Sequence, residues 1–95
     1  MKTNRINSNS FFNDLNFEEC EFAYGTGIQK CYRGPDGGFY RVDYFGDSYV
    51  IEFAEKEEAA KRNQFEDTDL YVDDGPIGEI IKKIKDDIKR FSEEA

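Results

Sequence analysis

The chain lacks histidine and has only two cysteines among its 95 residues. Without histidine, the Ser/His and Cys/His pairs that activate nucleophiles cannot form, and the usual zinc-ligand patterns are absent. Cys20 and Cys31 are separated by ten residues, and no second cysteine pair accompanies them, so a tetrahedral cysteine metal site would need two chains. We therefore expect a non-enzymatic protein with no catalytic residue, no metal site and no cofactor.

Long apolar runs and basic patches are also missing. No run approaches the ~20 apolar residues that span a membrane, and the opening Met1–Arg5 leads into polar residues rather than a signal-peptide segment. The lysines and arginine of residues 82–90 are interleaved with Asp86 and Asp87, which is typical of a solvated helix face. We expect a cytoplasmic protein that binds neither membrane nor nucleic acid directly, and the oligomeric state stays open.

The carboxylates and glycines do not fit known ligand-binding loops. A calcium loop beginning at Asp67 would have Tyr71 at its third ligand position and Val72 at its required glycine. The glycine-rich segments 25–27 and 34–38 lack the lysine and the spacing of phosphate-binding loops. The glycines therefore predict turns, and the acids have to be explained in another way.

The negative charge is concentrated in one region. Residues 55–74 contain eight acidic and three basic side chains and supply five of the eight excess negative charges of the protein. Residues 75–95 are neutral, with five acids and five bases. Because a local excess of carboxylates attracts cations and repels nucleic acid and anionic lipid, the distribution predicts a basic protein partner.

Aromatic residues make up 16% of the chain, and they gather in segments that predict strands at 19–24, 28–33, 39–45 and 48–54. Two-residue loops at Gly25-Thr26 and Gly46-Asp47 would place Cys20 opposite Cys31 and Arg41 opposite Glu52. The first hairpin would also pair Glu21 with Lys30. Opposite charges are thus paired in both hairpins, which favours a four-stranded antiparallel meander.

A four-residue loop, 34–37, would join the hairpins and place one set of mainly apolar residues on a single face. These are Cys20, Phe22, Tyr24, Cys31, Tyr40, Val42, Tyr44, Tyr49, Ile51 and Phe53. The other face would mix charged residues with Ala23, Ile28, Tyr32, Phe39, Phe45 and Val50. That mixture suits either a contact surface or a face covered by the N-terminal segment. The facing cysteines are expected as buried thiols, with a disulfide as the alternative.

The clearest helix is the last, because isoleucines and a phenylalanine recur every three or four residues. They are Ile77, Ile80, Ile81, Ile84, Ile88 and Phe91. A shorter helix is predicted from about Ala54 to Asn63, and 10–19 fits either a helix or a loose turn. Residues 70–72 fit a short strand or the anchor of an acidic loop. We expect one α+β domain over 1–95, packed on one face by the C-terminal helix, with 1–10 loosely ordered.

The acidic stretch is the candidate binding site. One interpretation is a solvated loop, and the other is a rigid negative surface, since apolar side chains alternate with the acids and would anchor them. The candidate partner-binding residues are Glu55, Glu58, Phe65, Glu66, Asp67, Asp69, Tyr71, Asp73 and Asp74. In the second interpretation the carboxylates carry the charge, and Tyr71 and Phe65 act as anchors.

The order of elements resembles the small acidic immunity proteins of bacterial polymorphic and contact-dependent toxin systems. The resemblance covers about residues 49–91: the segment 49–55 leading into a short helix, the segment 63–71, and a terminal amphipathic helix. It implies a partner that is a cationic toxin, commonly a nuclease whose substrate groove is blocked by the acidic surface. Two alternatives stay open: a phage or mobile-element mimic of nucleic acid that inhibits a host DNA-binding protein, and a general protein-interaction module.

Overall fold

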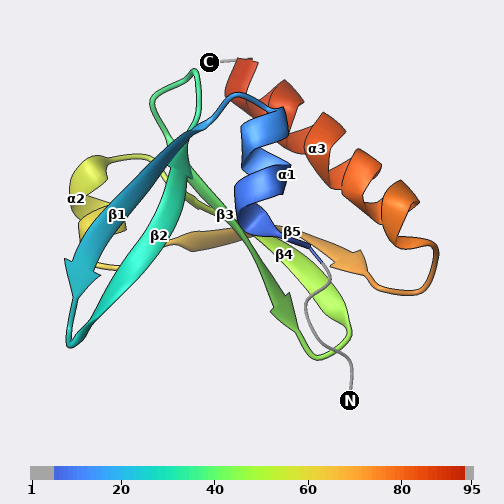
Figure 1. Cartoon of the computed structure of the whole chain (residues 1–95), viewed down its shortest axis with the longest axis horizontal. Coiled ribbons are helices and arrows are strands. Elements are labelled where there is room, and N and C mark those ends of the chain that lie inside the picture. Colours follow the sequence, from blue (N-terminus) through green and yellow to red (C-terminus); the bar gives the residue numbers. More distant parts are fainter. Residues whose placement is uncertain (1–5, 94–95) are drawn as a thin grey trace.

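Five antiparallel strands in the order β1-β2-β3-β4-β5 form the sheet of this protein, seen in a computed structural model that describes residues 6–93 (Figure 1). The strands are β1 (Glu18–Tyr24), β2 (Gly27–Arg33), β3 (Phe39–Phe45), β4 (Ser48–Ala54) and β5 (Glu66–Val72). The predicted α+β class and antiparallel sheet are confirmed. The predicted count of four strands is wrong, because residues 66–72 of the acidic stretch form a fifth strand.

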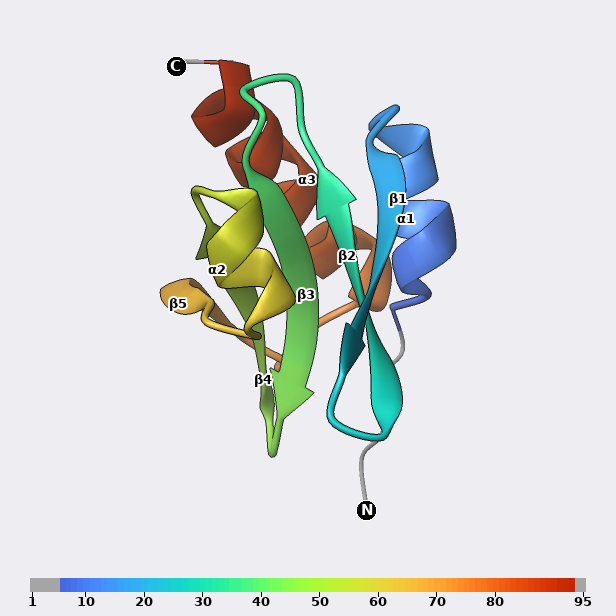
Figure 2. The same ribbon diagram turned by 90° about the vertical axis from the view of Figure 1, so that its left-hand side faces the viewer.

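Three helices cover the sheet: α1 (Ser8–Asp14), α2 (Glu57–Lys61) and α3 (Ile77–Glu93). α1 and α3 lie on one side and α2 on the other (Figures 1 and 2). The C-terminal helix forms as predicted, whereas α2 is shorter than predicted. α1 begins at Ser8, where the Asn7 side chain accepts a hydrogen bond from the Ser10 N–H, and Ile6 is buried. Of the residues expected to be loosely ordered, 1–5 lie outside the described residues.

Both predicted hairpin registers are confirmed. Cys20 lies opposite Cys31 in β1 and β2, and Arg41 lies opposite Glu52 in β3 and β4. Two-residue turns fix these pairings, because Gly25 and Gly46 adopt the positive φ angles that such turns require. Both cysteines are free thiols, Cys31 being buried and Cys20 half-buried.

The predicted connection between the hairpins is wrong by one residue. Arg33 lies opposite Phe39, so the loop has five residues, 34–38, rather than four. The Gly34 N–H donates to the Gly38 carbonyl oxygen at 2.9 Å, and the Asp36 carboxylate accepts from the Gly38 N–H at 3.0 Å. These bonds close the longer loop. Because side chains alternate along a strand, this shift of one residue places the side chains of β1 and β2 on the face of the sheet opposite to the predicted one.

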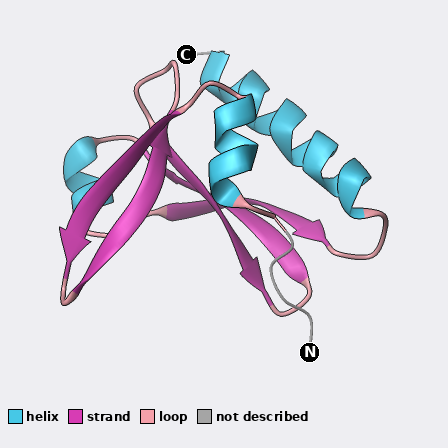
Figure 3. Ribbon diagram, in the orientation of Figure 1, coloured by secondary structure: helices cyan, strands magenta, loops and turns pink. Residues whose placement is uncertain are grey.

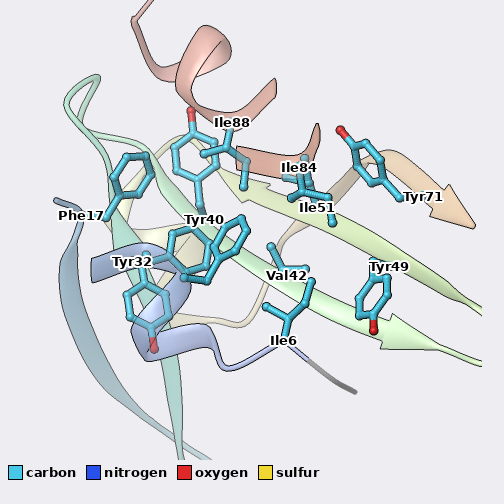
Figure 4. Close-up of a cluster of buried hydrophobic side chains, with 12 residues drawn as sticks. Ile6, Phe17, Tyr32, Tyr40, Val42, Tyr49, Ile51, Tyr71, Ile84 and Ile88 are labelled. Carbon is cyan, nitrogen blue, oxygen red and sulfur yellow. The ribbon is translucent and has the colours of Figure 1, made fainter. Parts of the chain in front are cut away.

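The shift divides the predicted apolar face between two cores. Cys20, Phe22 and Cys31 belong with α2, whereas Tyr40 and Val42 face α1 and α3. The main core lies between the sheet and helices α1 and α3 (Figure 4). Its buried residues are Ile6, Phe11, Phe12, Phe17, Tyr32, Tyr40, Val42, Tyr49, Ile51, Tyr71, Ile84 and Ile88. The smaller core beneath α2 consists of Cys31, Phe39, Ala54 and Ala60. The N-terminal segment therefore covers Tyr32, and α2 covers Phe39.

The two hairpins diverge after a short contact. β2 and β3 pair only at Tyr32 with Tyr40 and Arg33 with Phe39, whereas β3 and β4 pair over seven positions. Figure 3 shows the β1–β2 hairpin splaying away from β3 and β4. The sheet is thus a three-stranded unit, β3-β4-β5, joined at one corner to a two-stranded one.

Candidate functional site

β5 occupies the edge of the sheet and carries three of the eight acids of the acidic stretch, Glu66, Asp67 and Asp69. It pairs with β4 from Ser48 opposite Val72 to Phe53 opposite Glu66, with an irregularity at which the Thr68 hydroxyl donates to the Ile51 carbonyl oxygen at 3.1 Å. Tyr71 points into the main core beside Ile84 (Figure 4). These three acids are therefore fixed to a strand of the sheet, rather than carried on a loop.

Five of the expected acids follow this edge. Glu66 and Asp67 are exposed on β5, Asp69 is half-buried, and Asp74 is exposed just after the strand. Glu55 lies at the start of the edge, since it lines with Glu66 a depression of about 250 Å³ between β4, α2 and β5. Seven strand residues extend roughly 23 Å, so the carboxylates form a ridge of about that length. We call these five residues the acidic edge.

The acidic edge does not lie on one face of the sheet. Asp67 is opposite Glu52 and shares the face on which α2 packs, whereas Asp69 is opposite Ile51 and shares the face of α3. Glu58 is exposed on α2 itself. Because strand side chains alternate, an acidic strand exposes its charge along an edge rather than over a flat surface. The sequence did not indicate this arrangement.

Tyr71 and Asp73 are withdrawn from the surface. Tyr71 is 7% exposed, and its hydroxyl donates to the Asp87 carboxylate at 2.6 Å; burial, and then this bond, raise the pKa of Tyr71. Asp73 is 5% exposed and accepts from the Tyr44 hydroxyl at 3.2 Å, while its N–H donates to the Asp47 carbonyl oxygen. Both residues hold β5 in place. They are therefore structural, and we do not include them among the contact residues.

Phe65 also has a local partner. The Arg41 guanidinium lies 3.9 Å from the centre of its ring and binds both oxygens of Glu52, at 3.2 and 3.3 Å. Arg41 donates as well to the Asn63 side chain at 2.7 Å. Phe65 and Asn63 belong to the segment between α2 and β5, so this network fixes the start of the acidic edge. Burial, and then Asp43, raise the pKa of Glu52 to about 7 against the opposing effect of Arg41.

A groove runs beside the C-terminal half of β5. It encloses about 290 Å³ between the strand and the first turns of α3. Its lining includes Leu70, Val72, Asp74, Glu79, Ile80 and Lys83. Glu79, Ile80 and Lys83 were not among the predicted site residues, because only the packing of α3 brings them beside β5. The sequence contained one signal for the groove. Leu70 and Val72 alternate with core-facing residues, which indicates that these two apolar side chains point away from the core.

A larger cleft of about 540 Å³ opens where β2 and β3 diverge, and polar side chains line much of it. Its two cations are already paired: Arg41 with Glu52, and Lys30 with Glu19 at 3.3 Å. In residues 6–93 every buried side-chain nitrogen and oxygen has a hydrogen-bond partner. We therefore find no group in this cleft that calls for a ligand.

Residues 6–93 also lack two other features. No group of three or more His, Cys, Asp or Glu side chains is placed to hold a metal ion. None of the helices in this part of the chain has the length and apolar character needed to cross a membrane. Comparison with known proteins finds no matching family model, no matching curated protein and no matching solved structure.

Proposed function

We propose that this protein is a non-enzymatic inhibitor of the immunity type, which binds a cationic nuclease toxin and blocks its active site with the acidic edge. The observation that carries the proposal is the fixation of exposed carboxylates on a hydrogen-bonded edge strand. A surface that is already ordered loses little conformational entropy on binding, so more of its interaction energy contributes to affinity.

Shape and charge both support this target. The edge of a sheet is a narrow ridge, and the substrate site of a nuclease is a cationic groove. The chain carries a net charge of −8, which repels nucleic acid and steers a basic protein toward it. Complementary charge mainly raises the association rate, and salt screens it. Fast, salt-sensitive binding is therefore the expected kinetic behaviour.

Charge reversal tests the proposal. The site variant is Asp67→Lys/Asp69→Lys, and the matched control is Glu18→Lys/Glu21→Lys on β1, the opposite edge of the sheet. Both variants change the net charge by the same amount, and all four positions are exposed or half-buried. Thermal unfolding of each variant establishes that it folds.

The partner is first isolated by copurification with the wild-type protein from cells that produce it, and then identified by mass spectrometry. We expect a cationic nuclease that the wild-type protein inhibits. The association rate at low salt should fall about tenfold or more for the site variant, and much less for the control. Equal rates for the two variants, or a partner without nuclease activity, would overturn the proposal. A partner that is a DNA-binding protein with no enzymatic activity would favour a nucleic-acid mimic instead.

A further inference from the structure

We propose that the open edge of β5 binds an extended, cationic segment of the partner as a sixth strand, seated in the groove beside α3. The choice of a cationic partner rests on the proposed function. The mode of binding rests on independent observations: the direction of the backbone groups of β5, the exposure of its side chains and the position of the groove.

The register determines which backbone groups face outward. The two-residue turn makes Phe45 and Ser48 a hydrogen-bonded pair, so Ser48 points its backbone groups toward β3 and Tyr49 points its own toward β5. Tyr71, opposite Tyr49, therefore bonds to β4. The neighbouring residues Leu70 and Val72 consequently direct their N–H and C=O groups away from β4. In the described part of the chain β5 is the last strand of the sheet, so these groups face no further strand.

This half of the edge lacks the usual protection against strand addition. Natural edge strands are shielded by bulges, prolines, lysines or a covering element. In β5 the irregularity lies toward its N-terminal half, between the residues opposite Ile51 and Glu52. Residues 70–72 beyond it pair regularly with β4, and Leu70 is 64% and Val72 50% exposed. An exposed, regular and apolar edge is a template for another strand.

The groove restricts the side chains of the incoming strand. Residues that pair with Leu70 and Val72 would lie on the α2 side of the sheet, next to these two apolar side chains. Alternate residues would point to the other side, toward Asp69 and the groove, in whose lining the two acids Asp74 and Glu79 outnumber the one cation, Lys83. The geometry thus selects a segment in which apolar residues alternate with lysine or arginine.

Charge argues against a second copy of this chain as the occupant. Two β5 strands that paired edge to edge would bring together two acidic edges on molecules with a net charge of −8 each. Like charges on neighbouring strands are destabilising, whereas cationic side chains at the same positions would be attracted. The occupant is therefore a different and basic chain.

A peptide probe tests the inference without the natural partner. The probe is a capped seven-residue peptide of alternating valine and lysine, and the readout is amide hydrogen exchange by NMR. In the free protein, the Leu70 and Val72 amides should exchange much faster than that of Tyr71, which bonds to β4. Saturating peptide should slow their exchange about tenfold or more. An alternating valine and glutamate peptide is the charge control, and a glycine and lysine peptide is the strand control.

Proline provides a matched pair of variants. Leu70→Pro removes an outward N–H and leaves the bonds to β4 intact, which is a setting in which an edge strand tolerates proline. Leu70→Thr removes the apolar side chain and keeps the N–H. We expect Leu70→Pro to fold and to bind the peptide at least about tenfold more weakly, a loss of about 1.4 kcal/mol, with a smaller change for Leu70→Thr. If Leu70→Pro does not fold, the exchange measurement on the wild type decides.

Three results would overturn the inference: slow exchange of the Leu70 and Val72 amides in the free protein, equal protection by the lysine and glutamate peptides, or protection confined to another strand. Its failure is distinguishable from failure of the proposed function. If a nuclease partner is sensitive to Asp67→Lys/Asp69→Lys but not to Leu70→Pro, the function stands and strand addition is wrong. If the peptide adds to β5 but no nuclease is inhibited, the reverse holds.

Discussion

At the scale of single residues, Arg41 has to balance the charge of more than one carboxylate. Among the cations of residues 6–93 it is the one that contacts two carboxylates, Glu52 at 3.2 Å and Asp43 at 3.7 Å, and it also stacks on Phe65. Glu52 is only 7% exposed. Burial disfavours an ionised carboxylate, and a single guanidinium shared with a second carboxylate compensates this only in part. The raised pKa of Glu52 follows first from burial and then from Asp43, against the opposing effect of Arg41.

The pKa of Glu52 gives the stability of the protein a defined pH dependence. Its pKa is about 7 in the folded state and about 4.3 in an unfolded chain, so between these values the folded state holds a proton that the unfolded state has released. The free energy of unfolding should therefore fall as pH rises from about 5 to about 8, by on the order of 1 to 3 kcal/mol. Glu52→Gln should remove most of this slope, and Glu21→Gln, an exposed control, should preserve it. Urea unfolding at several pH values measures the effect; an unchanged slope in Glu52→Gln would contradict the assignment.

Among the elements, the hairpins were predictable and the join between them was not. Turns at Gly25 and Gly46 are local, so their sequences alone set the registers of β1–β2 and β3–β4. The loop 34–38 contains three glycines, and nothing in the residues themselves distinguishes four loop positions from five. The deciding contact is tertiary: Gly38 lies against the ring of Phe53, with no room for a side chain.

Gly38 is accordingly expected to be intolerant of substitution. A Cβ atom there would overlap the Phe53 ring, lying 2.9 Å from its Cζ atom, and Phe53 packs on Tyr40 in the core. Gly38→Ala should lower the free energy of unfolding by about 1 to 3 kcal/mol, as overpacking does. Gly27→Ala is the matched control, because its Cβ would meet no atom within 4 Å. Denaturant unfolding compares the two, and equal stabilities would show that the loop adapts without strain.

β5 was only half visible in the sequence for a similar reason. Strands are recognised by apolar alternation, but one side of β5 is exposed and its first residues are acidic, so only residues 70–72 gave a signal. The candidate acids were found because charge is a property of composition. The alternation in residues 70–72 gave Tyr71 as an anchor. The arrangement of the acids along an edge, the burial of Asp73 and the position of α3 beside the groove depend on contacts between distant segments.

At the scale of the whole molecule, the acidic edge is unfavourable for the fold itself. Five of the eight excess negative charges fall in residues 55–74, and Asp67 and Asp69 lie two residues apart on β5. Net charge of one sign destabilises the compact state through self-repulsion. Such residues persist where the remaining stability suffices, and the binding role proposed above would give a reason to retain them.

Removing charge from the acidic edge should therefore raise the stability of the protein and slow its binding. Asp67→Asn/Asp69→Asn should raise the free energy of unfolding at low salt by about 0.5 to 1 kcal/mol, and by less at high salt, where repulsion is screened. The same variant should bind its partner more slowly.

The control variant, Glu18→Gln/Glu21→Gln, removes the same charge from β1. Because Glu18 faces Arg33 and Glu21 faces Lys30, this variant should gain no stability or lose some. Thermal and urea unfolding at two salt concentrations measure these differences. A loss of stability in Asp67→Asn/Asp69→Asn at low salt would show that these carboxylates support the fold, and the argument that they are retained for binding would fail.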